Sequence, residues 1–74
     1  MKTHYEIDGY LTESGALETR EVTRRTSTAL RVGEKMSKQY PYVEVVLLLT
    51  DDEGDPENFS VVQVWHNGKK TIQK

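Results

Sequence analysis

Alternating apolar and polar residues near the start of the chain predict a strand over residues 3–12. In such a strand Tyr5, Ile7 and Leu11 share one face, because successive side chains point to opposite sides. The sequence Glu-Ser-Gly-Ala at residues 13–16 predicts a turn, since its glycine can adopt a positive φ without steric cost. The chain is therefore predicted to begin with a half-buried strand that ends in a turn.

Residues 16–25 fit two kinds of element. Thr19, Val22 and Thr23 favour a second strand that returns alongside the first, because β-branched residues pack well on a pleated sheet. A helix is the alternative, but Leu17 and Val22 lie five positions apart and form no apolar stripe. The pattern favours the strand.

A helix is predicted over residues 26–40. Thr26 or Ser27 can cap its N-terminus, and Pro41 ends it, because the residue before a proline avoids helical geometry. At about 100° per residue, one side gathers the mainly apolar residues Ala29, Val32, Gly33, Met36 and Tyr40. The opposite side gathers the basic residues Arg31, Lys35 and Lys38. Gly33 on the apolar side fits a close approach of the helix to a sheet.

Residues 42–50 are almost entirely apolar and predict a third strand, and residues 59–66 predict a fourth after an acidic loop. Asn67-Gly68 predicts a two-residue type I′ turn into a short last strand, Lys-Lys-Thr-Ile-Gln. The predicted fold is one α+β domain over residues 1–74. Its order is ββαββ(β). The fold has two layers, an antiparallel sheet of four to five strands and one helix packed on one face of that sheet.

One helix covers one face of a sheet, so the other face is predicted to carry surplus apolar surface. By strand alternation, that surface consists of Val46, Leu48, Val62 and Val64. Burying each such side chain is worth about 1.5–3 kcal/mol, so a cover is expected. Three covers stay open: the chain's own N-terminal strands, a second copy in a dimer, or a target protein.

Charge is segregated along the 74 residues, although the net charge is only −2. Residues 20–40 carry six basic and two acidic side chains, whereas residues 41–58 carry six acidic side chains and no basic one. Most of those acids lie in one loop, which we call the acidic loop: Asp51, Asp52, Glu53, Asp55 and Glu57. This loop can present carboxylates to a basic partner in the way that a nucleic acid presents phosphates.

The sequence has no cysteine, and its N-terminus is charged where a signal peptide would be apolar. Its longest uninterrupted apolar run, residues 45–49, is far shorter than the roughly 20 residues of a membrane-spanning helix. We therefore expect a cytoplasmic protein without membrane contact.

Candidate chemistry is sparse. His4, Glu6 and Asp8 share a strand face at a spacing that suits metal ligands, although a solvated face is the commoner meaning of such a pattern. The acidic loop lacks EF-hand spacing, because Pro56 stands where the glycine should be. Neither a phosphate-binding loop nor a nucleophile motif is present. We expect no enzymatic activity, cofactor or metal. A metal-assisted hydrolase built around His4, Glu6 and Asp8 is the third and last hypothesis.

Nucleic-acid binding is the second hypothesis. Basic residues that could track phosphates lie in and before the helix, at Arg24, Arg25, Arg31, Lys35 and Lys38. Lys69, Lys70 and the stacking surface of Trp65 could add a second contact. The alternative function is therefore a small nucleic-acid-binding accessory protein.

Four stretches define the layout of the chain: Tyr5-Glu6-Ile7, residues 26–30, Gln39-Tyr40-Pro41 and Asn67-Gly68. They open a strand, enter a helix, leave it and close a hairpin. This layout resembles that of small accessory proteins of bacteriophages and other mobile elements, including some anti-CRISPR inhibitors of type I systems. The resemblance implies a stoichiometric inhibitor that binds a host nuclease or surveillance complex. If a phage encodes the protein, its expected location is the host cytoplasm.

The sequence thus favours a non-catalytic inhibitor that acts by protein–protein contact. The expected contacts to a host defence complex or to a second copy are Val46, Leu48, Val62 and Val64 on the sheet, and Arg31, Lys35 and Lys38 on the helix.

Overall fold

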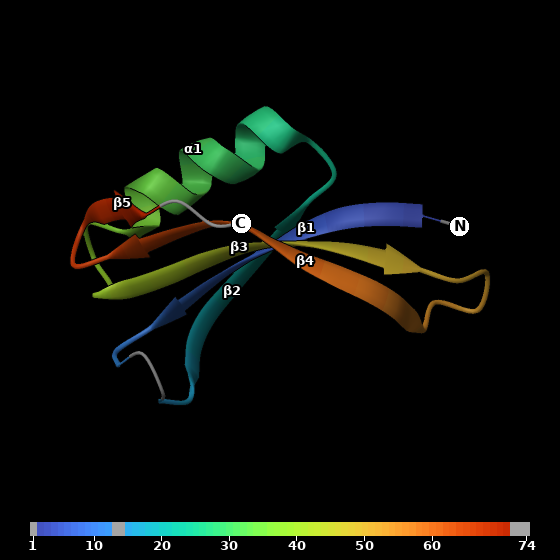
Figure 1. Ribbon diagram of the computed structural model, residues 1–74, viewed down its shortest axis with the longest axis horizontal. Coiled ribbons are helices and arrows are strands. Elements are labelled where there is room, and N and C mark those ends of the chain that lie inside the picture. The colour runs from blue at the N-terminus through green and yellow to red at the C-terminus, as the bar shows by residue number, and fades with distance from the viewer. Residues whose placement is uncertain (1, 13–14, 72–74) are drawn as a thin grey trace.

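The fold combines one helix with a five-stranded antiparallel sheet (Figure 1). The computed structural model describes residues 2–12 and 15–71. In chain order its elements are β1 (Lys2–Tyr10), β2 (Leu17–Thr23), α1 (Thr26–Met36), β3 (Tyr42–Thr50), β4 (Pro56–His66) and β5 (Lys69–Thr71). The predicted α+β class is confirmed. The predicted turn at residues 13 and 14 and the predicted strand residues 72 and 73 lie outside the described residues.

The strands lie in the order β2-β1-β3-β4-β5, so the first and third strands of the chain are central neighbours. β1 pairs with β3 along its whole length, from Lys2↔Thr50 to Tyr10↔Tyr42. The strand interpretation of residues 16–25 is also confirmed, because β2 forms a ladder with the second half of β1. Leu11 lies beyond the end of β1 and is 56% exposed, so it does not join Tyr5 and Ile7 in a buried row.

α1 packs on the sheet through the apolar side that its sequence predicts. Ala29, Gly33 and Met36 are buried in this contact, and Val32 and Tyr40 are partly buried beside them. The sheet contributes the fully buried side chains Ile7, Val43 and Val45 and the nearly buried ring of Trp65. This small cluster forms the hydrophobic core.

Both ends of the helix differ from the prediction. The N-cap is Arg25, which makes no side-chain capping bond, so neither Thr26 nor Ser27 is the cap. The Thr26 hydroxyl lies instead 2.6 Å from the hydroxyl of Tyr5 on β1, so it links the start of the helix to the sheet. The helix ends at Met36, before residues 37–39 form a turn that leads to Pro41.

The helix is too short to cover the sheet. At about 1.5 Å per residue its 11 residues span roughly 16 Å, whereas the nine residues of β3 span roughly 30 Å. Figure 1 shows α1 over one half of the sheet, with the other ends of β1, β3 and β4 running past it. Val43 and Val45 are therefore fully buried, whereas Leu47 and Leu49 in the same row are only half-buried.

The turn between β4 and β5 is the predicted hairpin. Asn67 and Gly68 both have positive φ, at 54° and 82°, which is the signature of a type I′ turn. Within the described part of the chain, no helix is long and apolar enough to cross a membrane.

Candidate protein-binding face

The face of the sheet away from α1 carries most of the polar side chains of the inner strands. Ile7 and Val45 pack under the helix, so their chain neighbours Asp8 and Glu44 point to the other side. We call this side the outer face. Ladder pairing brings together on it His4, Glu6, Asp8, Tyr10, Arg20, Tyr42, Glu44 and His66.

The four predicted contact residues do not form one exposed patch. Val46 and Val64 are on the outer face but are only 9% and 5% exposed, because each lies between two paired strands: Val46 between Glu6 and Val61, and Val64 between Glu44 and Thr71. Val62 packs against the core cluster instead of facing outwards. Leu48 is half-buried.

A β-bulge is the reason for the misplacement of Val62. Val45 pairs with Gln63 and Val46 pairs with Val61, so Val62 is an extra residue without a direct partner on β3. A bulge shifts the alternation of side chains by one position. Between the bulge and the start of β4, Val61 and Phe59 therefore face outwards, where unbroken alternation would place Val62 and Ser60.

Asp8 and Arg20 hold the centre of the outer face in place. The Asp8 carboxylate is nearly buried and accepts two hydrogen bonds from the Arg20 guanidinium, at 2.8 Å from Nε and 3.3 Å from Nη2. Arg20 Nε also lies 3.3 Å from Glu6 Oε1, and His4 Nε2 lies 3.7 Å from Glu6 Oε2. This chain of polar contacts ties β2 to β1 and fixes both carboxylates.

Aromatic rings border this polar centre at the end of the sheet near the β4–β5 hairpin. Tyr10 and Tyr42 have ring centroids 5.7 Å apart, and the Tyr42 and His66 rings are 6.2 Å apart in an edge-to-face arrangement. The Tyr42 hydroxyl donates to Glu44 Oε2 at 3.3 Å. The rings thus form a continuous aromatic row beside the carboxylates.

The electrostatics of the outer face are acidic at its centre. Among the described residues there, Glu6, Asp8 and Glu44 supply three carboxylates and Arg20 supplies one guanidinium. The hydrogen bond from Arg20 to Asp8 raises the pKa of the guanidinium, so Arg20 stays charged. Burial of the Tyr10 phenol, aided by Asp8 and Glu44, raises its pKa above the ordinary value of 10.0.

This shift gives a measurable pH dependence. Ionisation of Tyr10 is disfavoured in the folded state, because its folded pKa lies above the unfolded value of 10.0. Its contribution to stability is therefore intact below pH 10.0 and is lost as the pH rises from there through the folded pKa. In an absorbance titration of tyrosinate, the component that disappears in Tyr10→Phe should be a late-titrating one. Loss of an early component would contradict the burial of this phenol beside Asp8 and Glu44.

The outer face does not assemble a metal site from the residues that the structure describes. No group of three or more His, Asp or Glu side chains in those residues is arranged to hold an ion. His4, Glu6 and Asp8 do lie in a row, but Arg20 bonds to both carboxylates and provides the positive charge there.

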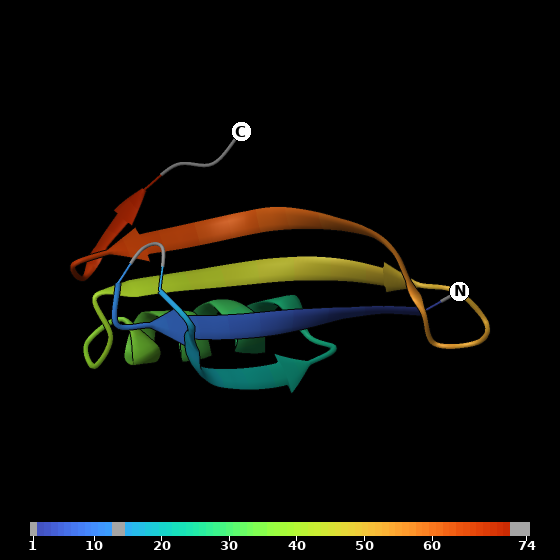
Figure 2. The ribbon, with the colours of Figure 1, turned by 90° about the horizontal axis from the view of Figure 1, so that it is seen from below.

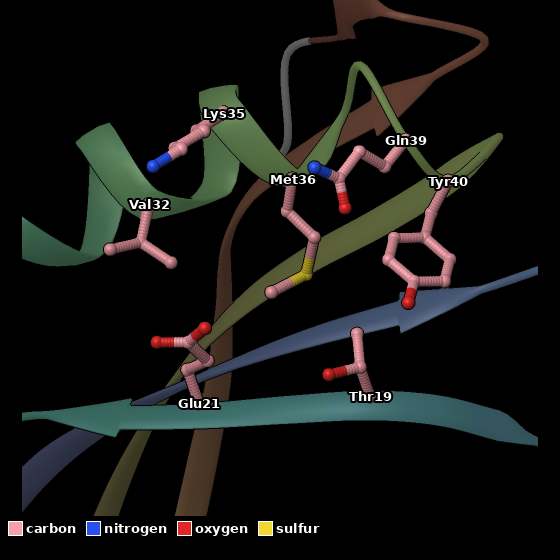
Figure 3. Close-up of a pocket in the computed structure, with 7 residues that line it drawn as sticks. All are labelled: Thr19, Glu21, Val32, Lys35, Met36, Gln39 and Tyr40. Atoms are coloured by element: carbon pink, nitrogen blue, oxygen red, sulfur yellow. The ribbon is translucent and has the colours of Figure 1, made fainter.

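The basic helix residues lie on the other side of the molecule. Arg31 and Lys35 are exposed on α1, and Arg24 and Arg25 are exposed just before it. Lys38 is exposed too, but it lies in the turn after Met36 and not on the helix as predicted, because the helix ends two residues earlier. A cleft of 340 Å³ separates this helix from β2 (Figure 3). In it Lys35 projects from α1 and Glu21 from β2, with Met36 between the two walls, so an acidic residue lies across from one of the predicted basic contacts.

The acidic loop is an ordered turn. Asp51 Oδ1 accepts from the backbone N–H groups of Glu53 and Asp55, each at 2.9 Å, and Gly54 has a φ of 89°. The Asp51 carboxylate is therefore engaged within the loop, which leaves the neighbouring exposed carboxylates Glu53, Asp55 and Glu57 at its surface.

Sequence reasoning did not single out Tyr10, Arg20, Tyr42 or Glu44. Strand alternation is the feature that could have found them, because the chain neighbours of a buried residue such as Ile7 or Val45 lie on the opposite face of the sheet. Using that signal requires the β1–β3 register, which depends on two strands 40 positions apart in the chain.

Comparison with known proteins finds no match to this chain among protein-family models, curated proteins or solved structures. Functional inference therefore rests on the geometry of the outer face.

Proposed function

We propose that this protein is a non-catalytic inhibitor that binds a basic protein surface through its outer face. The observation that carries the proposal is the aromatic row Tyr10, Tyr42 and His66 beside a fixed, net acidic centre. Tyrosine is enriched at the energetic centres of protein interfaces, because it buries a large ring at a low entropy cost and keeps a polar tip.

The chemistry of this face selects cationic side chains. A lysine or arginine of a partner can rest on a tyrosine ring and at the same time reach a carboxylate, which combines cation–π attraction with an ion pair. Because Asp8 and Glu6 are already held by Arg20, little side-chain entropy is lost there on binding. Glu44 contacts the aromatic row directly, because it accepts a hydrogen bond from the Tyr42 hydroxyl.

Basic surfaces of this kind occur where proteins hold nucleic acids. The resemblance in layout to phage accessory proteins and type I anti-CRISPR inhibitors supports a host nuclease or surveillance complex as the partner. In this proposal the carboxylates occupy a nucleic-acid site in place of phosphates, and the acidic loop adds long-range attraction.

Titration calorimetry with a purified type I surveillance complex tests this proposal. Glu44→Lys reverses a charge on the outer face and should weaken binding by about 30-fold or more, the loss of a hot-spot residue. Lys35→Glu is the matched reversal on the helix and should change binding by less than about threefold. Absence of binding, or an unaffected Glu44→Lys variant of native fold, would reject the proposal.

Nucleic-acid binding by the basic helix is the second candidate, supported by the exposure of Arg24, Arg25, Arg31, Lys35 and Lys38. This second candidate predicts the opposite effects for Glu44→Lys and Lys35→Glu. Binding to a DNA duplex should then fall steeply with salt and weaken in Lys35→Glu, while Glu44→Lys should leave it intact or strengthen it.

A further inference from the structure

On the side of the sheet where β5 lies, most of β4 has no described strand paired to it. β5 pairs with β4 only at residues 64–66 in the described part of the chain. Figure 2 shows the remaining length of β4 continuing along the edge beyond β5. Residues 57–62 thus have β3 on one side and no described strand on the other.

The two edges of the sheet differ in how they are protected. The edge strand β2 carries the charges Glu18, Arg20 and Glu21, and charged side chains discourage pairing with another strand. On β4 the stretch Asn-Phe-Ser-Val-Val at residues 58–62 is uncharged and has high strand propensity. Its Phe59 side chain is 68% exposed. This second edge has the composition of a pairing surface.

Local structure leaves this edge ready for a partner strand. The backbone N–H of Phe59 bonds to the side chain of its neighbour Asn58, at 2.8 Å, a local bond that an incoming carbonyl can replace. A hollow of 220 Å³ lies beside the edge and includes Leu47, Leu49 and Ser60 in its lining. These half-buried leucines belong to the part of the sheet that α1 does not reach, and the hollow can receive side chains from outside.

We propose that a second copy of this chain occupies the edge, with the two β4 strands paired antiparallel about a two-fold axis near Ser60. This register places Phe59 of one copy opposite Val61 of the other, twice by symmetry. Aromatic and β-branched residues form favourable cross-strand pairs. The axis is perpendicular to the sheet, so both outer faces lie on one side of the dimer and remain free.

Charge supports a second copy over an unrelated strand. In this arrangement the acidic loop of each copy, which precedes β4, runs toward the end of the other copy's β4. There β5 carries the exposed residues Lys69 and Lys70. Asp55, directly before the first residue of β4, is the acidic-loop residue that the register places opposite position 65 of the other copy, beside its β5. The segregation of acidic and basic residues along the sequence thus becomes complementary between two copies.

The experiment uses the absence of natural cysteine in the chain. Residues directly opposite in an antiparallel pair have Cα atoms about 4.5–5.5 Å apart, within disulfide range. Ser60→Cys should therefore form a disulfide-linked dimer under mild oxidation, at least about tenfold faster than Glu34→Cys on the exposed side of α1. Equal rates for the two variants would overturn the proposed register.

Sedimentation equilibrium supplies the second measurement. The unmodified protein should dimerise with a Kd of about 1–100 µM, typical of a small interface. Phe59→Lys should sediment as a monomer and keep its thermal stability, since the ring is mostly exposed. A monomeric wild type at 500 µM (about five times the weakest expected Kd) would overturn the proposal. So would dimerisation that appears only after residues 72–74 are deleted, because those residues would then be the natural cover of the edge.

Discussion

Replacing Gly33 by alanine is expected to destabilise the protein, although alanine is the better helix former. A Cβ at this position would lie 2.6 Å from Cζ3 and 2.8 Å from Cη2 of Trp65, and 2.9 Å from Cγ2 of Val45. Such contacts force the helix away from the sheet or the indole out of its place. Overpacking costs about 1–3 kcal/mol, and three contacts below 3.0 Å place this case in the upper part of that range. After the gain of about 1 kcal/mol in helix propensity, a net loss of about 1–2 kcal/mol is expected.

Thermal unfolding measures this effect, and the expected fall in Tm is about 5–15 °C for a domain of this size. Glu34→Ala, at the next and exposed position of α1, should shift stability by less than about 0.5 kcal/mol. In a Trp65→Phe background the ring no longer reaches position 33, so Gly33→Ala should cost less there. A rise in Tm for Gly33→Ala in the wild type would show that the helix sits farther from the sheet.

Replacing Arg20 by methionine is expected to destabilise the protein by about 1–3 kcal/mol at neutral pH. The variant leaves the Asp8 carboxylate, whose side chain is only 5% exposed, without its two hydrogen bonds from the guanidinium. The value lies below that of a fully buried pair because the Arg20 side chain is 45% exposed, so water can partly replace it.

Chemical denaturation of a set of variants tests this interpretation. Arg24→Met, at an exposed position just beyond β2, should change the free energy of unfolding by less than about 0.5 kcal/mol. Asp8→Asn combined with Arg20→Met should recover part of the loss, since a neutral amide needs no counter-charge. If the double variant is as unstable as the sum of the single ones, Asp8 and Arg20 do not act as a pair.

Local sequence patterns were enough to predict which elements form and of what type. Period-two alternation located β1, and an almost entirely apolar run located β3. A 3.6-residue period located the buried side of α1 with Ala29, Gly33 and Met36, and Asn67-Gly68 located the last turn. These features are local, because each depends on residues within a few positions of one another. Local steric and propensity rules therefore suffice to predict them.

The tertiary structure alone decided which surfaces are available. The bulge at Val62 reverses which side chains of the first half of β4 face outwards. No glycine or other local sequence feature around Val62 predicts this bulge. The register of β1 against β3 assembles Tyr10, Tyr42 and Glu44 into one face, and the short helix leaves Leu47 and Leu49 half-covered. Each of these outcomes depends on contacts between distant segments, whose energies are compared only when the whole sheet and helix pack together.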